Sequence, residues 1–339
     1  MLKIGLVGVG YLGSRHLKHL CELKGVEVAG IWDTNPVVVA NTAKQFGVLA
    51  ASGLDELLAE CRAVVLAAPT SQHYKIGCQV IDAGRALFVE KPICATADEG
   101  RRLVDMASQS NVILQVGHIE RFNRAWRALQ GLTIRPRFIE VHRLAEWNPR
   151  GIDVAVVHDL MIHDLDLVLN LIQAYPSQIH ASGVSVITPT VDIAAARLEF
   201  PQGQVANLTA SRISLKKMRK LRMFGENEYI ALDLGKGICE FIGVDDGTKD
   251  LSAGTATLGE MRFGKLNRRV YRKMLEADEG DAMRLELTAF RNAILHGEPP
   301  AVSGEDGLRA LELAEQIVDS IAKSSAPQHG SNMLPAAEV

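Results

Sequence analysis

The first 33 residues, MLKIGLVGVGYLGSRHLKHLCELKGVEVAGIWD, decide how the chain begins to fold. A short apolar run leads into GVGYLG at 8–13, and an amphipathic stretch then leads into a second apolar run. Glycines spaced G-x-G-x-x-G between a strand and a helix are typical of a dinucleotide-binding βαβ unit. Gly8 permits a tight turn, Gly10 lets the backbone approach a pyrophosphate, and Gly13 lets the helix pack closely on the strand. The stretch therefore predicts a phosphate-binding loop at a helix N-terminus.

An acidic residue, Asp33, ends the second apolar run, twenty residues after Gly13. A carboxylate there can accept hydrogen bonds from the adenine ribose hydroxyls and would repel a 2′-phosphate. The next three residues, TNP at 34–36, offer no cation for such a phosphate. We therefore expect NAD rather than NADP; the alternative is a glycine-rich turn followed by a surface aspartate. The expected contacts of this loop region are Gly8, Gly10, Tyr11, Leu12, Gly13 and Asp33.

The hydrophobic pattern changes along the chain and predicts two domains. Five short apolar runs, at 3–7, 26–32, 63–68, 86–90 and 112–117, alternate with stretches of helical spacing, as in a buried parallel sheet. Strand-like runs then follow between 138 and 234, with hairpin turns at PQG and GEN, and helices are expected at 282–296 and 307–323. The predicted fold class is α/β. A doubly wound Rossmann sheet over 1–120 is followed by an α+β domain over 121–323 with a large, mostly antiparallel open sheet. The final helix is expected to be able to pack back on the first domain, and the tail, 324–339, is expected to be disordered.

Composition and charge narrow the class of protein. The 339 residues are 47% hydrophobic and 23% charged with a net charge of −3, which gives no general electrostatic reason to expect nucleic acid or an anionic membrane as partner. The five cysteines are scattered without metal-site spacing, so reduced thiols in the cytoplasm are expected. No apolar run reaches the ~18 residues of a membrane span, and the N-terminus does not resemble a signal peptide. We expect a cytoplasmic protein with a small-molecule substrate and no metal.

Further polar residues follow the later strands of the first domain. AAPTSQH at 67–73 places Pro69, Thr70 and His73 at the carboxyl edge of the sheet, where ligands bind in such folds. His73 could face the nicotinamide ribose or, equally, solvent at a helix start. The strand at 86–89 runs into Glu90 and Lys91, which would sit beside the nicotinamide.

A helix is predicted over 157–172, VHDLMIHDLDLVLNLI, with Asp159 and His163 on one face because they are four residues apart. Oxidising an alcohol needs a base for the hydroxyl proton, and histidine, with a pKa of ~6.5, suits that role. Alternatively, Asp159 caps the helix and His163 is a packed core residue. A metal site built from these two residues with His158 and Asp164 is opposed by the ~100° divergence of adjacent helical positions.

Together these motifs resemble the Gfo/Idh/MocA family of oxidoreductases over nearly the whole chain. The resemblance rests on GVGYLG, Asp33, AAPTSQH, EKP at 90–92, GHIERFN at 117–123, DLMIH at 159–163 and GEDGLRALELAEQI at 304–317. It implies that Lys91 orients nicotinamide and substrate and shares in proton transfer, and that Glu90 contacts a cofactor ribose. It also implies that His163 is the general base, with Asp159 orienting it or holding a substrate hydroxyl. Relatives are commonly homodimers or homotetramers, so a subunit contact is expected on the C-terminal sheet.

The segment 140–224 resembles a narrower subgroup, the bacterial UDP-N-acetylglucosamine 3-dehydrogenases. That resemblance implies oxidation of the 3-hydroxyl of a UDP-N-acetylhexosamine by hydride transfer to nicotinamide C4. The basic cluster at 212–222 could bind the diphosphate, or could be a solvated edge or a subunit interface. The expected substrate-binding residues are Arg121, Asn123, Arg143, Asn148, Arg150, Arg212 and Lys216.

Two other functions remain open at this stage. One is a polyol, inositol or aldose dehydrogenase of the same family. The other is an NAD-binding sensor or structural subunit without turnover, which would have no chemical need for Lys91, Asp159 and His163 together. A second basic run, 262–273, is expected to be a solvated face or a mobile loop.

Overall fold

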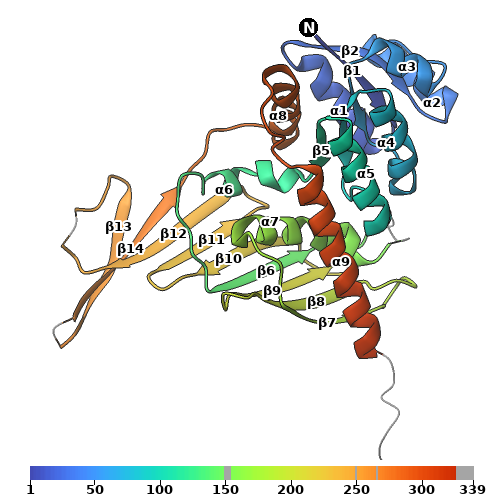
Figure 1. The fold of residues 1–339 in the computed structure, drawn as a ribbon. Coiled ribbons are helices and arrows are strands. Elements are labelled where there is room, and N and C mark those ends of the chain that lie inside the picture. The colour runs from blue at the N-terminus through green and yellow to red at the C-terminus, as the bar shows by residue number, and fades with distance from the viewer. Residues whose placement is uncertain (149–153, 249, 265, 326–339) are drawn as a thin grey trace, which may run out of the picture.

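The computed structural model describes residues 1–148, 154–248, 250–264 and 266–325, and these form two sheets joined by helices (Figure 1). The first sheet is parallel throughout, and the order of its strands is β2 (Val26–Trp32), β1 (Leu2–Val7), β3 (Ala63–Leu66), β4 (Ala86–Glu90) and β5 (Leu114–Gly117). Each of these strands was predicted, and β3 and β4 are buried over their whole length. The predicted Rossmann sheet is confirmed.

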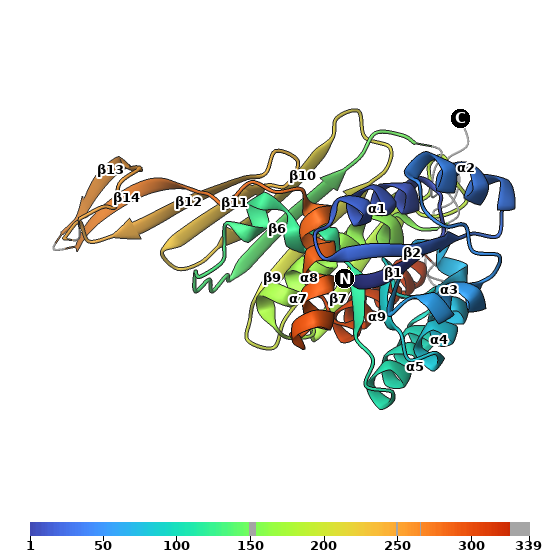
Figure 2. The same ribbon diagram turned by 90° about the horizontal axis from the view of Figure 1, so that it is seen from above.

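Helices connect these strands on both faces of the first sheet, as Figure 2 shows from above. They are α1 (Tyr11–Glu22), α2 (Pro36–Phe46), α3 (Leu54–Glu60), η1 (Thr70–Gln72), α4 (His73–Asp82) and α5 (Ala97–Gln109). The predictions did not include α2 and α3. For α2 the sequence holds a signal, because the Asn35 side chain accepts hydrogen bonds from the first turn and Pro36 occupies a first-turn position.

The second sheet is mostly antiparallel, with one parallel pair, β6 with β9. The order of its strands is β13 (Thr255–Phe263), β14 (Leu266–Leu275), β12 (Ile238–Asp245), β11 (Glu228–Asp233), β10 (Met218–Phe224), β6 (Phe138–Leu144), β9 (Val205–Ser211), β8 (Ile193–Glu199) and β7 (Gln178–Val184). Both predicted hairpin turns join antiparallel neighbours, β8 with β9 and β10 with β11. The predicted large, mostly antiparallel sheet is confirmed.

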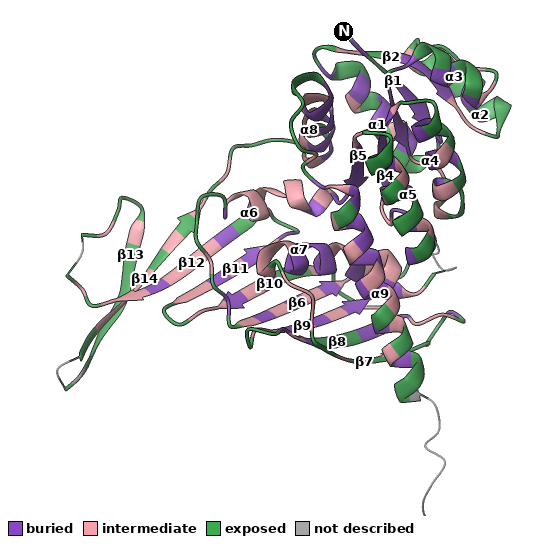
Figure 3. Ribbon diagram, viewed as in Figure 1, coloured by how far each residue is buried: buried purple, intermediate pink, exposed green. Residues whose placement is uncertain are grey.

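Of the two predictions for the basic run 262–273, the mobile loop is wrong, because most of the run belongs to the strands β13 and β14, whereas its exposure agrees with a solvated face. This hairpin extends away from the helices and is largely exposed or half-buried (Figures 1 and 3). Its arginines pair across strands: Arg269 contacts Asp245 and Arg272 contacts Glu240 of β12. Because neither face is buried by a helix, the sequence lacks the apolar alternation that identifies a strand.

The remaining helices lie at the junction between the two sheets (Figures 1 and 2). They are η2 (Ile119–Phe122), α6 (Arg124–Arg127), the π-helical turn η3 (Val157–Met161), α7 (Ile162–Ile172), α8 (Ala282–His296) and α9 (Gly304–Ser325). Helix α7 lies over the inner face of the second sheet, and its apolar side chains form one core with those of β6, β8, β9 and β10. A subunit contact on the outer face of this sheet stays a prediction.

The two C-terminal helices also complete the first domain. Phe290 of α8 packs edge-on against Phe88 of β4, with ring centroids 5.8 Å apart. Helix α9 lies so close to β5 that a Cβ on Gly307 would stand 2.5 Å from the Val116 side chain. The predicted second domain included α8. The buried side chains of this helix nevertheless pack in one core with those of the first sheet. None of the described helices is long and apolar enough to cross a membrane.

Candidate active site

The glycine loop joins β1 to α1 and leaves space above it. Gly8 has φ +87°, and a Cβ there would lie 2.6 Å from the backbone nitrogen of Ala68. A Cβ on Gly13 would lie 1.9 Å from the carbonyl oxygen of Gly8, so helix and loop require both glycines. A Cβ on Gly10 would meet nothing within 4 Å. Gly10 therefore leaves room for a ligand at the N-terminus of α1, which has no side-chain cap.

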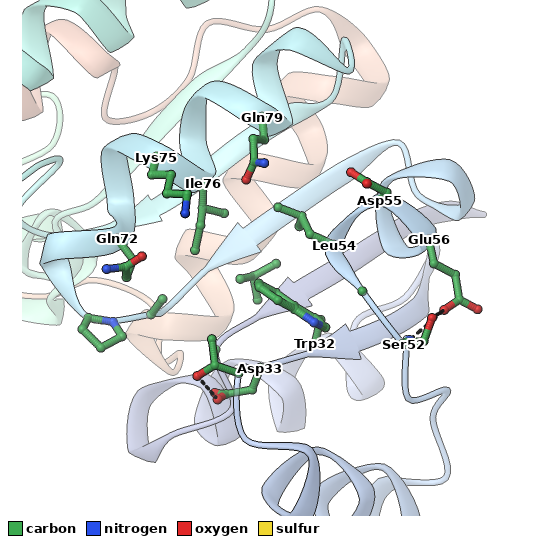
Figure 4. Close-up of a pocket in the computed structure, with 16 residues that line it drawn as sticks. Trp32, Asp33, Ser52, Leu54, Asp55, Glu56, Gln72, Lys75, Ile76 and Gln79 are labelled. Carbon is green, nitrogen blue, oxygen red and sulfur yellow. Dashed lines mark hydrogen bonds between the residues drawn. The ribbon is translucent and has the colours of Figure 1, made fainter.

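Asp33 lies at the carboxyl end of β2 and lines a cavity of about 800 Å³ (Figure 4). Its Oδ2 accepts a hydrogen bond from the backbone N–H of Val9 (2.9 Å), which ties it to the glycine loop. Figure 4 shows Trp32 and Asp33 on one side of this cavity and Lys75 and Gln79 of α4 on the other. Sequence reasoning missed Lys75, because only the tertiary structure brings α4 opposite β2. The cavity and the loop together fit a dinucleotide whose adenosine lies beside Asp33.

The side chains of Tyr11 and Leu12 face outward on the first turn of α1, where the tyrosine ring lies under the Arg15 guanidinium at 5.8 Å. Their expected cofactor contacts stay predictions. Pro69 lines the cavity beside Asp33 and also a second cavity of about 600 Å³, which Thr70 lines too.

Neither interpretation of His73 holds in the structure. Its imidazole is buried, and its two ring nitrogens lie 2.9 Å from the carbonyl oxygens of Pro92 and Ala68. His73 therefore links the loop after β3 to the loop after β4, and its imidazole is accessible neither to a ribose nor to solvent.

Lys91 follows β4 and projects into the second cavity, between the two sheets. Its Nζ donates a hydrogen bond to the backbone carbonyl of Asp159 (2.7 Å) and lies 3.7 Å from the Asp159 carboxylate. Burial lowers the pKa of Lys91, whereas the charges of Asp159 and Glu90 oppose that shift. Asp159 belongs to the π-helical turn η3, a distortion that is frequent at functional sites. The structure thus brings together Lys91 and Asp159, two of the three residues that the resemblance gave catalytic roles.

The structure gives Glu90 a different role from the predicted ribose contact. One carboxylate oxygen lies 2.6 Å from Nε2 of the buried His16 on α1, and the other accepts the backbone N–H of Lys91 (3.2 Å). Glu90 therefore links α1 to the backbone at Lys91, and its negative charge favours the protonated form of the lysine. Sequence reasoning missed His16, whose spacing after the glycine loop carries no distinctive signal.

His163 lies on the first turn of α7, close enough to Lys91 and Arg143 for their charges to act on it. Burial lowers the pKa of His163 well below its usual value, and those two cations lower it further. The imidazole is therefore neutral near pH 7, which is the form that accepts a proton. Its Nδ1 is buried and has no hydrogen-bond partner among the described residues.

A second imidazole, His118, lies edge-on to His163 with ring centroids 6.4 Å apart. It is fully buried, and within the described ranges neither of its ring nitrogens has a hydrogen-bond partner. Sequence reasoning missed it, although a histidine directly after β5 stands at the same sheet edge as Lys91 and could have been noticed on that ground.

Comparison with known proteins agrees with this arrangement. Residues 2–118 match the oxidoreductase family with an NAD-binding Rossmann fold, and residues 128–327 match the C-terminal alpha/beta domain of the same family. The chain belongs to the Gfo/Idh/MocA family. Its members of known name include the UDP-N-acetylglucosamine 3-dehydrogenase of Acidithiobacillus ferrooxidans, to which this chain is 32% identical over 93% of its own length and 96% of the relative's.

Two further comparisons concern a solved structure and a relative that is named for a different substrate. A crystal structure of that 3-dehydrogenase superposes with a TM-score of 0.83 at 31% identity, covering 95% of this chain and 98% of the other. The inositol 2-dehydrogenase of Rhizobium meliloti is 24% identical over 95% of this chain and 97% of the relative. The chain is thus an NAD-binding oxidoreductase of a family whose named members act on more than one kind of sugar or polyol.

Buried ion pairs engage two residues that the sequence predicted to bind substrate, Arg143 and Arg121. Arg143 holds Asp164 through two hydrogen bonds (2.8 and 2.7 Å) and Glu120 through a third (2.8 Å). Arg121 holds Asp166 in the same bidentate way (2.6 and 2.7 Å). These pairs join η2 and β6 to α7 and correct the substrate roles predicted for both arginines. Because Asp164 turns to Arg143, it does not converge with His158, Asp159 and His163 as a metal site would require.

Asn123 also has a structural role in place of the predicted substrate contact. Its Oδ1 accepts the N–H of Ala125 and so caps α6, while its Nδ2 donates to Glu120 and to the carbonyl of Leu234 (both 2.9 Å). Arg212 is likewise buried, and it donates to the carbonyl of Val154 (2.6 Å) near the start of η3. It therefore anchors the chain entering the Asp159 segment.

Two other predicted substrate residues lie at the surface of this region. Lys216 and Asn148 are exposed, on the segments that follow β9 and β6. Arg150 lies outside the described residues. The structure thus brings Lys91, Asp159 and His163 together, whereas acidic or carbonyl groups of the protein engage Arg121, Arg143 and Arg212.

Proposed function

We propose that this NAD-dependent oxidoreductase oxidises a secondary alcohol on a nucleotide sugar, specifically the 3-hydroxyl of a UDP-N-acetylhexosamine. The observation that carries the alcohol chemistry is the half-buried His163, whose lowered pKa keeps it neutral, close to Lys91 at the carboxyl edge of the NAD-binding sheet. The substrate class is supported by the similarity, over nearly the full length of both chains, to an enzyme named for the 3-dehydrogenation of UDP-N-acetylglucosamine.

In this proposal the residues of the chain handle the proton and the geometry. NAD, when bound, supplies the acceptor for the hydride that leaves the sugar carbon. His163 takes the hydroxyl proton as the carbon–oxygen double bond forms. Lys91 donates a hydrogen bond to the same oxygen, and the Asp159 carbonyl holds its Nζ in position. Positioned acid–base catalysis of this kind contributes about 10²- to 10⁴-fold in rate.

The proposed cofactor contacts are the backbone of the glycine loop and the carboxylate of Asp33. Asp33→Asn keeps an oxygen that can accept the Val9 N–H but removes the negative charge. We expect the ratio of the Kd for NADP to the Kd for NAD to fall by about 10-fold or more, because the 2′-phosphate no longer meets a carboxylate. Titration of both cofactors measures this, with Asp82→Asn, at the exposed end of α4, as the control. An unchanged ratio would remove Asp33 from ribose recognition.

A second candidate, oxidation of an inositol or another free polyol, is favoured by a specific observation. Arg121, Arg143 and Arg212 are engaged within the protein, which leaves fewer guanidinium groups for a diphosphate than the sequence suggested. The inositol 2-dehydrogenase relative is in keeping with that alternative.

An assay of NADH formation separates these candidates. The enzyme is given NAD with UDP-N-acetylglucosamine, UDP-N-acetylgalactosamine, myo-inositol or free aldoses, and an aminotransferase is added to draw off the ketone. We expect NADH to form with a UDP-N-acetylhexosamine. NADH formation with a free polyol alone would overturn the nucleotide-sugar proposal, and no turnover with any alcohol would favour an NAD-binding sensor.

A further inference from the structure

The register of β10 divides the basic segment 212–222 between two faces of the second sheet. Leu221 and Met223 are buried in the core beneath α7. Successive side chains of a strand point to opposite faces, so Arg219 shares the inner face with those two residues. Lys220 and Arg222 lie on the outer face, away from the Asp159 and His163 helix. Only part of the basic segment can therefore reach a substrate at His163.

Arg219 has unused hydrogen-bonding capacity on the inner face. Its side chain is 57% exposed, and the one ion pair found for it in the described structure is with Glu120, at 3.7 Å. The same oxygen of Glu120 already accepts a hydrogen bond from Arg143 at 2.8 Å. At 3.7 Å the contact between Arg219 and Glu120 is too long for a hydrogen bond, so the N–H donors of the Arg219 guanidinium are available to another acceptor.

The neighbouring cations differ in this respect. Lys217 lies 3.3 Å from Glu146, and Arg222 lies 3.2 Å from Glu140 on the outer face. Arg212 is buried under the chain that enters η3. Among the arginines of this segment, Arg219 is thus the one that lies on the inner face, has an exposed guanidinium and makes only a long contact with a carboxylate.

Arg219 also lies close enough to His163, the proposed base, for its charge to act on that imidazole. It stands directly opposite Arg143 in the β10–β6 pair, and Arg143 binds Asp164, the residue after His163. The charge of Arg219 is one of those that act on His163. A group held by Arg219 would therefore belong to the same bound molecule as a hydroxyl at His163.

We propose that Arg219 binds an anionic group of the substrate while His163 faces the hydroxyl that is oxidised. The matching chemistry is a phosphate of a sugar nucleotide or the carboxylate of a sugar acid, since a planar guanidinium can bind two oxygens of either. This inference rests on the proposed function for the role of His163, and it assigns the anion to one member of the basic cluster that was not among the expected substrate-binding residues.

The test compares two arginines of one strand that lie on opposite faces. Arg219→Gln and Arg222→Gln are purified as full-length chains, and ligand binding to the NAD-loaded protein is measured by calorimetry. The probes are UDP-N-acetylglucosamine, UDP, glucuronic acid and myo-inositol. We expect Arg219→Gln to weaken UDP-N-acetylglucosamine binding by roughly 10- to 100-fold, because a charge-assisted hydrogen bond is lost. Arg222→Gln should stay within about 2-fold of the wild type, and Arg219→Lys should lose less than Arg219→Gln.

Each probe separates one explanation from another. A loss with UDP but not with glucuronic acid identifies phosphate, and the reverse identifies carboxylate, while myo-inositol binding should not change in either variant. Equal losses in both arginine variants, or no loss in Arg219→Gln, would overturn the proposal. Wild-type protein that binds none of the anionic probes would overturn it as well. If the wild type binds UDP-N-acetylglucosamine through Arg219 but forms no NADH, the proposed reaction fails and the binding site stands.

Discussion

Replacing Lys91 by methionine is expected to lower kcat by about 10³-fold while NAD binding changes little. The substitution keeps the aliphatic stem but removes the ammonium group that the Asp159 carbonyl holds at 2.7 Å. A preorganised donor aimed at a reacting oxygen contributes about 10²- to 10³-fold, and any part Lys91 takes in proton transfer adds to that. Steady-state kinetics with the substrate identified in the NADH assay gives kcat, and fluorescence titration gives the Kd for NAD.

The control is Lys236→Met, which removes an exposed lysine from the turn between β11 and β12. That variant should match the wild type in both measurements. Thermal unfolding of the two variants shows whether the Asp159 carbonyl, left without its donor, has weakened the fold. A Lys91→Met enzyme that keeps wild-type kcat would remove the ammonium group from the chemistry.

The first domain was predictable because its signals are local. The glycine loop, the apolar strands and Asp33 follow one another within a single βαβ unit, so short-range spacing defines both the sheet and one ligand contact. The contact between Lys91 and Asp159 is not local: the family resemblance named both residues, but only the structure shows that they meet. Their spacing of 68 residues carries no physical signal by itself.

The errors among the arginines have a common cause. A guanidinium in a candidate site suggests an anionic ligand, but here Asp164 and Asp166 of α7 supply that anion. Which acid meets which arginine depends on how α7 packs on β6 and η2, and no local pattern shows this. Part of the answer was nevertheless available. Arg143 has the same strand parity as the buried Ile139 and Val141, so alternation alone places it on the covered face.

Replacing His163 by asparagine is expected to lower kcat by about 10²- to 10⁴-fold, the range for loss of a positioned general base. Asparagine keeps a polar side chain in a half-buried position but accepts no proton near neutral pH. His180→Asn, on an exposed position of β7, is the matched control and should leave kcat unchanged. A kcat near the wild-type value in the His163 variant would mean that another group accepts the proton, and the buried His118 would be the next to test.

The pH dependence of kcat/KM gives a sharper test, since it follows the protonation state of the base in the free enzyme. Burial together with the charges of Lys91 and Arg143 lowers the pKa of His163 well below its usual value. The imidazole is active when neutral, so activity should be present above the folded-state pKa and lost as the pH falls through it. We therefore expect the acid limb of the wild-type profile to lie below pH ~6.5, the pKa of an unperturbed histidine. In His163→Asn the residual activity should lose that limb, and a limb that persists at the same pH would belong to a different group.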